Sequence, residues 1–399
     1  MQAINLRRVM IIAGLTVLIV IYPLLWLRMM GSRAERTGAD FIGFYAAAHI
    51  AQNEGAGQIY TPYLQQRIEQ QLVGFELVPG QVLLFNHLPY LVPLLRLIVD
   101  ENYVTSFIRW TVILLFLTII DTGVFLALLK KLDFNRRLLI VLAAGTVLFY
   151  PIFTSLMNGQ DTVFLLLGGA IWMWGCLSEK NFFAGLGLGL MTIRPQLALI
   201  LALPFLFKKR KVLYWFILCM GILGIFVLLY LGLDGTLNFL HILTISASGE
   251  WYGLHPEAMP TLTGLLHRIF PNLAGGAIQI IGLSGFLLAM ITLCAFWRKS
   301  DQIGSTQIGL AVIVGVFFVP YLHYHDLALL LIPIYCLIKV APPAKRGLIV
   351  LLPLAISFFL LIGFFWTPIT YLVVLMTMIA LAYFLWDLKW TRNRDLLGV

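Results

Sequence analysis

The sequence predicts an all-α polytopic membrane protein, and three observations support this class. Of the 399 residues, 61% are hydrophobic and only 11% are charged, whereas an average soluble domain is about 25% charged. The mean hydropathy is +0.94. The apolar residues gather in runs of about 20, the length that a helix needs to cross a bilayer. We therefore expect one transmembrane domain over residues 1–399.

The apolar runs give the expected helices in order. The first run follows Arg7 and Arg8, but it is too long for the core of a signal peptide and no A-x-A pattern closes it. The stretch 182–207 is broken by Arg194 and Pro195, which predicts a hairpin of two short half-helices. Counting the hairpin as two gives a bundle of about 12 transmembrane segments. The other runs are 9–30, 106–129, 138–156, 161–178, 212–233, 273–297, 305–322, 327–341, 347–366 and 368–388.

Basic clusters between the runs predict the orientation, because short cytoplasmic loops carry an excess of Lys and Arg. All these clusters can lie on the cytoplasmic side only if the hairpin at 182–207 enters and leaves the membrane on the same side. Both termini are then cytoplasmic, and two long loops, 31–105 and 234–272, are extracytoplasmic. Segments 40–53 and 61–73 mix polar and apolar residues with helical periodicity, which predicts amphipathic helices on the membrane surface. The clusters are Arg7–Arg8, 130–137, 208–211, Arg298–Lys299 and Lys345–Arg346.

Charge and cysteine content argue against other classes of protein. The formal net charge is +9, but the basic residues form no stripe with exposed aromatic residues, so nucleic-acid binding is not expected. Each cysteine lies within an apolar run, and no pair has the spacing of metal ligands. We interpret them as small buried hydrophobic residues. They are Cys176, Cys219, Cys294 and Cys336.

Asp40 stands just after the first membrane helix, in the stretch TGADFIGFYAAAHI. One interpretation is an N-cap for the helix that follows. The other is a general base at the membrane surface, because a partly buried carboxylate can accept the proton of a substrate hydroxyl. The local sequence leaves both open.

The turn NGQD (158–161) separates two apolar runs. Asn-Gly is typical of a plain polar turn. Polar groups at membrane depth are costly unless they line protein or water. The alternative is therefore that Asn158, Gln160 and Asp161 face an outward cavity.

Arg194 lies in the middle of an apolar stretch, where a lone arginine costs roughly 2.5 kcal/mol or more on insertion scales. It should therefore face a partner or a polar cavity. An internal carboxylate, Asp40 or Asp161, would make it a structural ion pair. We favour an anion clamp for a phosphate, because guanidinium suits phosphate. Pro195 also breaks the helix and frees backbone N–H groups for the same anion.

His323, His325 and Asp326 fall in the run YLHYHDLALLL, between two helices. Their spacing can indicate a metal, but no other ligands are visible, so no metal site is predicted. A proton-relay or substrate-binding role for one histidine is favoured.

The second outer loop offers further polar and aromatic residues. Trp251 is either an interfacial anchor or a surface on which a sugar ring stacks, and the sequence does not decide. Its companions are Glu250, Tyr252, His255, Glu257 and His267.

Taken in order, these pieces resemble the membrane glycosyltransferases of the GT-C class, and most closely glycosyltransferase family 87, the polyprenol-phosphate-mannose-dependent mannosyltransferases. The resemblance covers roughly 40–340. The chain has HLPY (87–90) where family members often show a Pro-Pro pair, and the loop 245–268 matches nothing. The matching stretches are ADFIGFYAAAHIAQNEGAGQIYTP (39–62), FNHLPYLVPLL (85–95), NGQDTVFLLLGGA (158–170), FFAGLGLGLMTIRPQLALILALPFLFKKRK (182–211) and YLHYHDLALLLIPI (321–334).

The resemblance implies a role for each matching residue. Asp40 would be the general base, and Arg194 and Gln160 would bind the donor phosphate. His323 or His325 would assist at the acceptor or the phosphate. The pocket would be lined by Tyr45, Tyr60, Asn158, Asp161 and Trp251.

The implied reaction moves a hexose, expected to be mannose, from a polyprenyl-phosphate-linked donor to a lipid or glycan acceptor. It takes place with inversion at the outer face of the plasma membrane. Because the leaving group is a monophosphate, no cofactor is obligatory, although a divalent cation is compatible with the chemistry.

Other functions fit less well. A transporter or flippase of a lipid-linked sugar also needs a polar cavity in the membrane, but we find no inverted repeats. An O-antigen ligase or polymerase usually relies on several outer-face arginines, which are few here. A purely structural membrane subunit is the remaining alternative.

Overall fold

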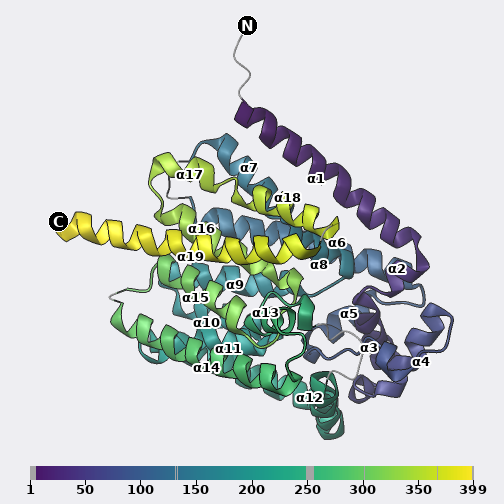
Figure 1. Cartoon of the computed structure of the whole chain (residues 1–399). Helices are drawn as coiled ribbons and strands as arrows, with labels where there is room; N and C mark the ends of the chain where they lie inside the picture. Colours follow the sequence, from purple (N-terminus) through teal and green to yellow (C-terminus); the bar gives the residue numbers. More distant parts are fainter. Residues whose placement is uncertain are drawn as a thin grey trace.

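The structure, a computed structural model, describes residues 6–130, 132, 134–248, 256–300, 302–365 and 367–397 (Figure 1). Every regular element in these ranges is a helix, which confirms the all-helical class. The α-helices are α1 (Leu6–Gly31), α2 (Arg33–Thr37), α3 (Phe41–Asn53), α4 (Pro62–Val73), α5 (Val92–Ile98), α6 (Tyr103–Ala127), α7 (Arg136–Val147), α8 (Tyr150–Asn158), α9 (Thr162–Leu177), α10 (Asn181–Leu190), α11 (Pro195–Ala202), α12 (Arg210–Ser248), α13 (Leu262–Ile269), α14 (Gly275–Lys299), α15 (Ser305–Phe318), α16 (Leu331–Val340), α17 (Pro343–Ile349), α18 (Leu352–Phe365) and α19 (Thr367–Leu397).

Seven helical stretches in the described part of the chain are long and apolar enough to cross a membrane, so the chain is a multi-pass membrane protein. Five shorter apolar helices of 10–17 residues accompany them. The expected total of about 12 crossings stays a prediction. The seven long stretches are Ile11–Gly31, Tyr103–Ala127, Arg136–Asn158, Arg210–Ser246, Gly275–Lys299, Pro343–Gly363 and Thr370–Asp387.

The stretch around Arg194 folds into two short helices, α10 and α11, joined through a 3₁₀ turn. Pro195 is the first residue of α11, where its missing N–H has no intrahelical partner to lose. The flanks of the stretch meet, because Nζ of Lys209 lies 3.7 Å from Oε1 of Glu179. The two ends of this stretch therefore lie close together, and Arg194 lies in the turn between its two helices.

α10 lies between α9 and α12 at the short distances that glycine allows. A Cβ at Gly187 would overlap the backbone of Trp172 on α9. A Cβ at Gly185 would lie 2.8 Å from the carbonyl oxygen of Val212 on α12. This packing on both sides fixes the depth of α10, and so the place where Arg194 is held.

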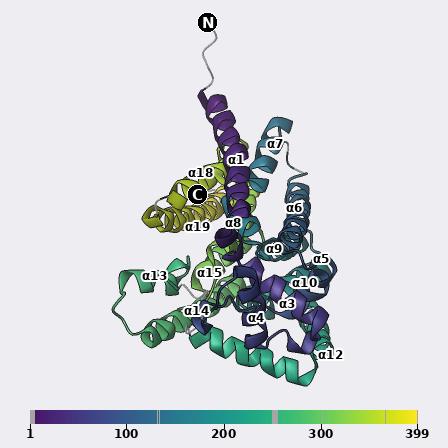
Figure 2. The same cartoon turned by 90° about the vertical axis from the view of Figure 1, so that its right-hand side faces the viewer.

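The first long loop forms a group of helices, α2 to α5, at the end of α1 (Figures 1 and 2). α3 is buried from Phe41 to Ala51 except at His49. The prediction of an amphipathic surface helix over 40–53 is therefore wrong. α3 packs against α4, α5 and α6, and a helix that is apolar all round belongs to a core. α4 does have two faces, with Tyr63 exposed and Ile68 buried.

α12 bends at Gly232, where φ is 70° and ψ is 179°, a backbone conformation that is essentially restricted to glycine. After the bend the helix continues to Ser248, past Asp234, where the second loop was expected to begin. The segment Ala56–Gln58 packs on the bend, and a Cβ at Gly57 would lie 2.8 Å from the carbonyl oxygen of Leu231. The half of α12 that follows the bend is thereby attached to the first loop.

Replacing Gly232 by alanine should destabilise the protein by about 1–3 kcal/mol, because the added Cβ disfavours this backbone conformation. No atom lies within 4 Å of that Cβ, so the effect comes from the backbone alone. The measurement is the thermal unfolding temperature of the purified protein in detergent.

Gly221→Ala in the same helix is the matched control, since its Cβ also meets nothing and its backbone is helical. Alanine there should be neutral or slightly stabilising. Equal unfolding temperatures for the two variants would contradict the account of the bend.

Candidate active site

A cavity of about 1290 Å³ lies between the first loop, the turn before α9, the turn before α11, α12 and the segment before α16. Cavities that bind drug-sized ligands are roughly 300–1,000 Å³, so this one can hold a larger molecule. Its polar lining consists mainly of Asp40, Asn86, His87, Asn158, Gln160, Arg194, Gln196, His323 and His325. One face of α12 supplies apolar lining through Met220, Val227, Leu228, Phe239, Leu240 and Leu243.

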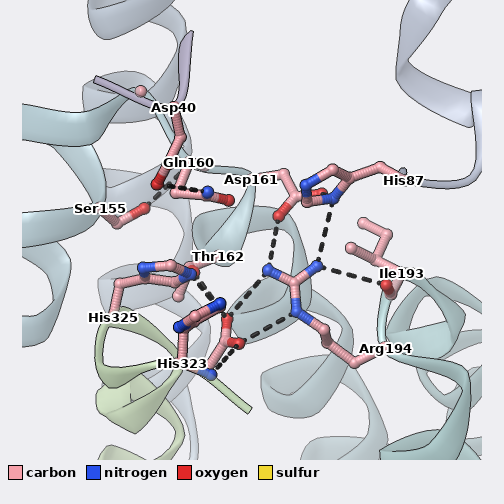
Figure 3. Close-up of polar contacts among 12 residues, drawn as sticks. Asp40, His87, Ser155, Gln160, Asp161, Thr162, Ile193, Arg194, His323 and His325 are labelled. Atoms are coloured by element: carbon pink, nitrogen blue, oxygen red, sulfur yellow. Dashed lines mark hydrogen bonds and ion pairs between the residues drawn. The ribbon is translucent and has the colours of Figure 1, made fainter. Parts of the chain in front are cut away.

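Asp40 lies at the N-terminus of α3, but its side chain makes no capping hydrogen bond. Its Oδ2 instead accepts a hydrogen bond of 2.6 Å from Nε2 of Gln160 (Figure 3). The carboxylate is therefore directed into the cavity, and the capping interpretation is wrong.

The turn that carries Gln160 is rigidly built. Gly159 has φ of 69°, and its carbonyl oxygen accepts from Nε1 of Trp110 at 2.8 Å. Oγ of Ser155 donates to the backbone carbonyl of Gln160 at 3.0 Å. The turn places the side-chain amide of Gln160 next to the carboxylate of Asp40, and its predicted contact with a phosphate stays a prediction.

Arg194 is buried between two carboxylates. Its Nη2 lies 3.0 Å from Oδ1 of Asp161, and its Nε lies 3.0 Å from Oδ2 of Asp326. Thr162 donates to Oδ1 of Asp326 at 2.8 Å, which satisfies that oxygen further. An internal ion pair of this kind was the structural alternative for Arg194, and the structure contains it.

The ion pairs engage Nε and Nη2 of the guanidinium and leave Nη1 without a close acceptor. Nη1 of Arg194 has a contact of 3.3 Å to the carbonyl of Ile193 and one of 3.5 Å to Nδ1 of His87, both at the long limit of hydrogen bonding. Arg194 also lines the cavity. Two carboxylates more than balance its charge, so an anion in the cavity would be held by N–H donation from Nη1 and not by net charge.

His87 is a residue of the site that the sequence did not single out. Its Nδ1 lies 3.0 Å from Oδ2 of Asp161, and its ring packs near the rings of Phe44 and Phe85. Tyr60 donates to the backbone carbonyl of His87 at 2.5 Å. The only sequence signal was the departure of HLPY from the family pattern.

α4 holds the segment that leads to His87. Oε2 of Glu69 accepts from the backbone N–H of Leu83 at 3.0 Å, and Oε1 of Gln65 accepts from that of Phe85 at 2.7 Å. The two side chains are one helical turn apart, so they bind alternate amides of an extended segment. Burial raises the pKa of Glu69 to about 8.

His323 and His325 both line the cavity. Nε2 of His323 lies 2.6 Å from the hydroxyl of Tyr321, and Nε2 of His325 is buried 3.8 Å from Oδ1 of Asp326. Among the residues that the structure describes, no group of three or more His, Cys, Asp or Glu is arranged to hold a metal.

Of the residues expected to line the pocket, only Asn158 does so among those that the structure describes. Tyr45 donates to the carbonyl of Asp100, away from the cavity, and Tyr60 is buried behind His87. Asp161 lies beneath the surface of the cavity and pairs with Arg194. Trp251 lies outside the described residues.

The chain was compared with known protein families, curated proteins and solved structures. The family model described as "Glycosyltransferase family 87" matches residues 88–333, more than half of the chain. The match contains Gln160, Arg194, His323 and His325, and it begins just after His87. No curated protein and no solved structure matches significantly.

Arg194→Gln should destabilise the protein strongly, because Asp161 and Asp326 would remain buried without their cation. Breaking a buried ion pair in this way typically costs about 3–5 kcal/mol. The unfolding temperature in detergent measures the effect. Arg109→Gln, at the exposed pair with Asp100, is the control and should cause a much smaller change. Equal changes in the unfolding temperature of the two variants would show that the buried ion pairs of Arg194 do not stabilise the fold as proposed.

Glu69 should make stability depend on pH. Its pKa rises from an ordinary 4.5 to about 8 on folding, so the folded protein holds this proton more tightly than the unfolded chain. The resulting stability is complete below about pH 4.5 and is lost progressively as the pH rises toward about 8. Glu69→Gln should flatten the unfolding temperature between pH 5 and pH 9. Glu76→Gln, at an exposed position of the same loop, should not, and a slope unchanged in Glu69→Gln would refute the assignment.

Proposed function

The chain belongs to glycosyltransferase family 87, and on that basis we propose that it transfers a hexose, mannose in the first instance, from a polyprenyl-phosphate donor to a lipid or glycan acceptor. The observation that carries the choice of donor is the composition of the cavity. A polar cluster around Asp40 and Arg194 and an apolar face of α12 line the same space. A polyprenyl-phosphate sugar is likewise polar at its sugar-phosphate head and apolar along its isoprenoid tail, so its two parts match the two linings of the cavity.

The proposed chemistry is a direct displacement at the anomeric carbon. Asp40 accepts the proton of the acceptor hydroxyl while that oxygen forms the new bond to C1. The bond from C1 to the phosphate oxygen breaks, and its electron pair leaves with the polyprenyl phosphate. Attack from the face opposite the leaving group inverts the anomeric centre. Gln160 positions the carboxylate through the 2.6 Å hydrogen bond.

Arg194 serves the leaving group in this proposal. Negative charge grows on the phosphate as the bond to C1 breaks, and a fixed N–H donor at that place stabilises the transition state more than the ground state. Nη1 is the atom available for this, since Nε and Nη2 are engaged by Asp326 and Asp161. One of His323 and His325 assists at the acceptor or the phosphate.

The membrane orientation supports an active site on the outer face of the plasma membrane. The basic clusters between the apolar runs favour cytoplasmic termini. Asp40 and the first loop then lie on the outer side, where a polyprenyl-phosphate sugar and its acceptor meet.

A transfer assay tests the reaction. Purified protein in nanodiscs receives polyprenyl-phosphate-[radiolabelled] mannose together with a membrane-lipid extract as acceptor. Label in a new lipid or glycan product is the expected result. Label that stays on the donor across several sugars and acceptor extracts would overturn the proposed donor.

Asp40→Asn should lower the transfer rate by roughly 10²- to 10⁴-fold, the usual contribution of a general base. The asparagine keeps the shape of the side chain and an oxygen for Gln160, so donor binding should change little. Asp100→Asn, in the same loop but outside the cavity, should remain active. Full activity in Asp40→Asn would show that the base is another residue.

A further inference from the structure

The orientation of His87 follows from its contact with Asp161. A carboxylate only accepts hydrogen bonds, so Nδ1 of His87, at 3.0 Å from Oδ2, must carry a hydrogen. This contact fixes the orientation of the ring and leaves its other nitrogen, Nε2, free to bind a ligand. No hydrogen bond of Nε2 to the described residues is seen, while His87 lines the cavity with 17% of its side chain exposed.

The neighbouring guanidinium has a matching donor. Nδ1 of His87 carries a hydrogen and cannot accept from Nη1 of Arg194, so their 3.5 Å contact brings two donors together. One N–H of Nη1 is directed at the carbonyl of Ile193 at 3.3 Å, so its other N–H, on the side of His87, lacks an acceptor among the described residues. Figure 3 shows His87 and this edge of Arg194 side by side, with Asp40 and Gln160 on the other side of the cluster.

The balance of charge calls for further N–H donors. Asp161 and Asp326 carry two negative charges against one positive charge on Arg194. An anion beside this cluster therefore has to be held by N–H groups that point at it, and a hydrogen on Nε2 of His87 would supply one from the cavity side of the ring. Charge-assisted hydrogen bonds of this type are the strong ones.

We propose that His87 is a second ligand of the donor phosphate, oriented by Asp161 and acting beside Arg194. This inference rests on the proposed function. During the displacement His87 keeps its proton and donates a hydrogen bond to a phosphate oxygen, while the acceptor proton goes to Asp40. The phosphate then has two N–H donors, from Nε2 of His87 and Nη1 of Arg194.

Two substitutions separate this role from a structural one. The amide nitrogen of asparagine can replace Nδ1, so His87→Asn keeps the contact with Asp161 and loses the donor into the cavity. The amide nitrogen of glutamine reaches the place of Nε2, so His87→Gln keeps that donor. The probe is undecaprenyl phosphate titrated into the protein in nanodiscs, together with KM and kcat in the transfer assay.

His87→Asn should raise the Kd for undecaprenyl phosphate and the KM for the donor by about 10- to 100-fold, the worth of one hydrogen bond to a charged group. His87→Gln should raise them less. His241→Asn, at an exposed histidine outside the cavity, should match the wild type. The reverse order, with asparagine better than glutamine, would show that His87 only supports Asp161 and would overturn the proposal.

The wild-type protein gives an independent measurement if either variant folds poorly. Diethyl pyrocarbonate modifies accessible imidazole nitrogens that carry no hydrogen, so a phosphate that covers Nε2 of His87 and holds a hydrogen on it blocks the reaction there. The modified residues are read by peptide mass spectrometry. Saturating undecaprenyl phosphate should protect His87 and leave His241 reactive. An unprotected His87 would overturn the inference.

The outcomes also separate this inference from the proposed function. If the wild type transfers the sugar but His87→Asn and His87→Gln have the same Kd and KM, only the proposed role of His87 is wrong. The difference in phosphate binding without any transfer would keep the site and remove the proposed reaction.

Discussion

The buried guanidinium of Arg194 is the constraint around which the site is arranged. In apolar surroundings this cation needs anionic partners, and Asp161 and Asp326 supply them. The three residues come from the start of α9, the break before α11 and the segment before α16, so their pairing fixes three parts of the bundle relative to one another. Asp161 also binds His87, which connects the first long loop to the same centre.

The helical membrane fold could be predicted because long apolar runs have few alternatives in lipid. The break at Arg194 and Pro195 could be predicted for a similar reason, since charge and proline both interrupt a membrane helix. α3 was misjudged because its burial is not a local property. Its covering partners α4, α5 and α6 come from elsewhere in the chain. The bend at Gly232 was missed because glycine permits a left-handed backbone without requiring it.

The candidate site was predictable where a polar residue stood at a costly depth in the membrane, as at Gln160 and Arg194. Its internal connections were not. Asp326 is 132 residues from Arg194 in sequence, and the spacing around it suggested a histidine role instead. His87 reaches the cavity because the N–H groups of the backbone segment before it donate hydrogen bonds to Gln65 and Glu69, and such contacts leave no pattern of side-chain types in the sequence.

The wall that α12 forms has a consequence for the surrounding lipid. Its 37-residue apolar stretch would span roughly 55 Å if straight, against a hydrocarbon core of about 30 Å. One face of this helix lines the cavity, while Ile225 and Leu229 on other faces are exposed. In a bilayer, this one helix would therefore stand between the cavity and the acyl chains that cover its exposed residues. Hydrophobic mismatch with the bilayer would then bear on the position of α12, and through it on the width of the cavity.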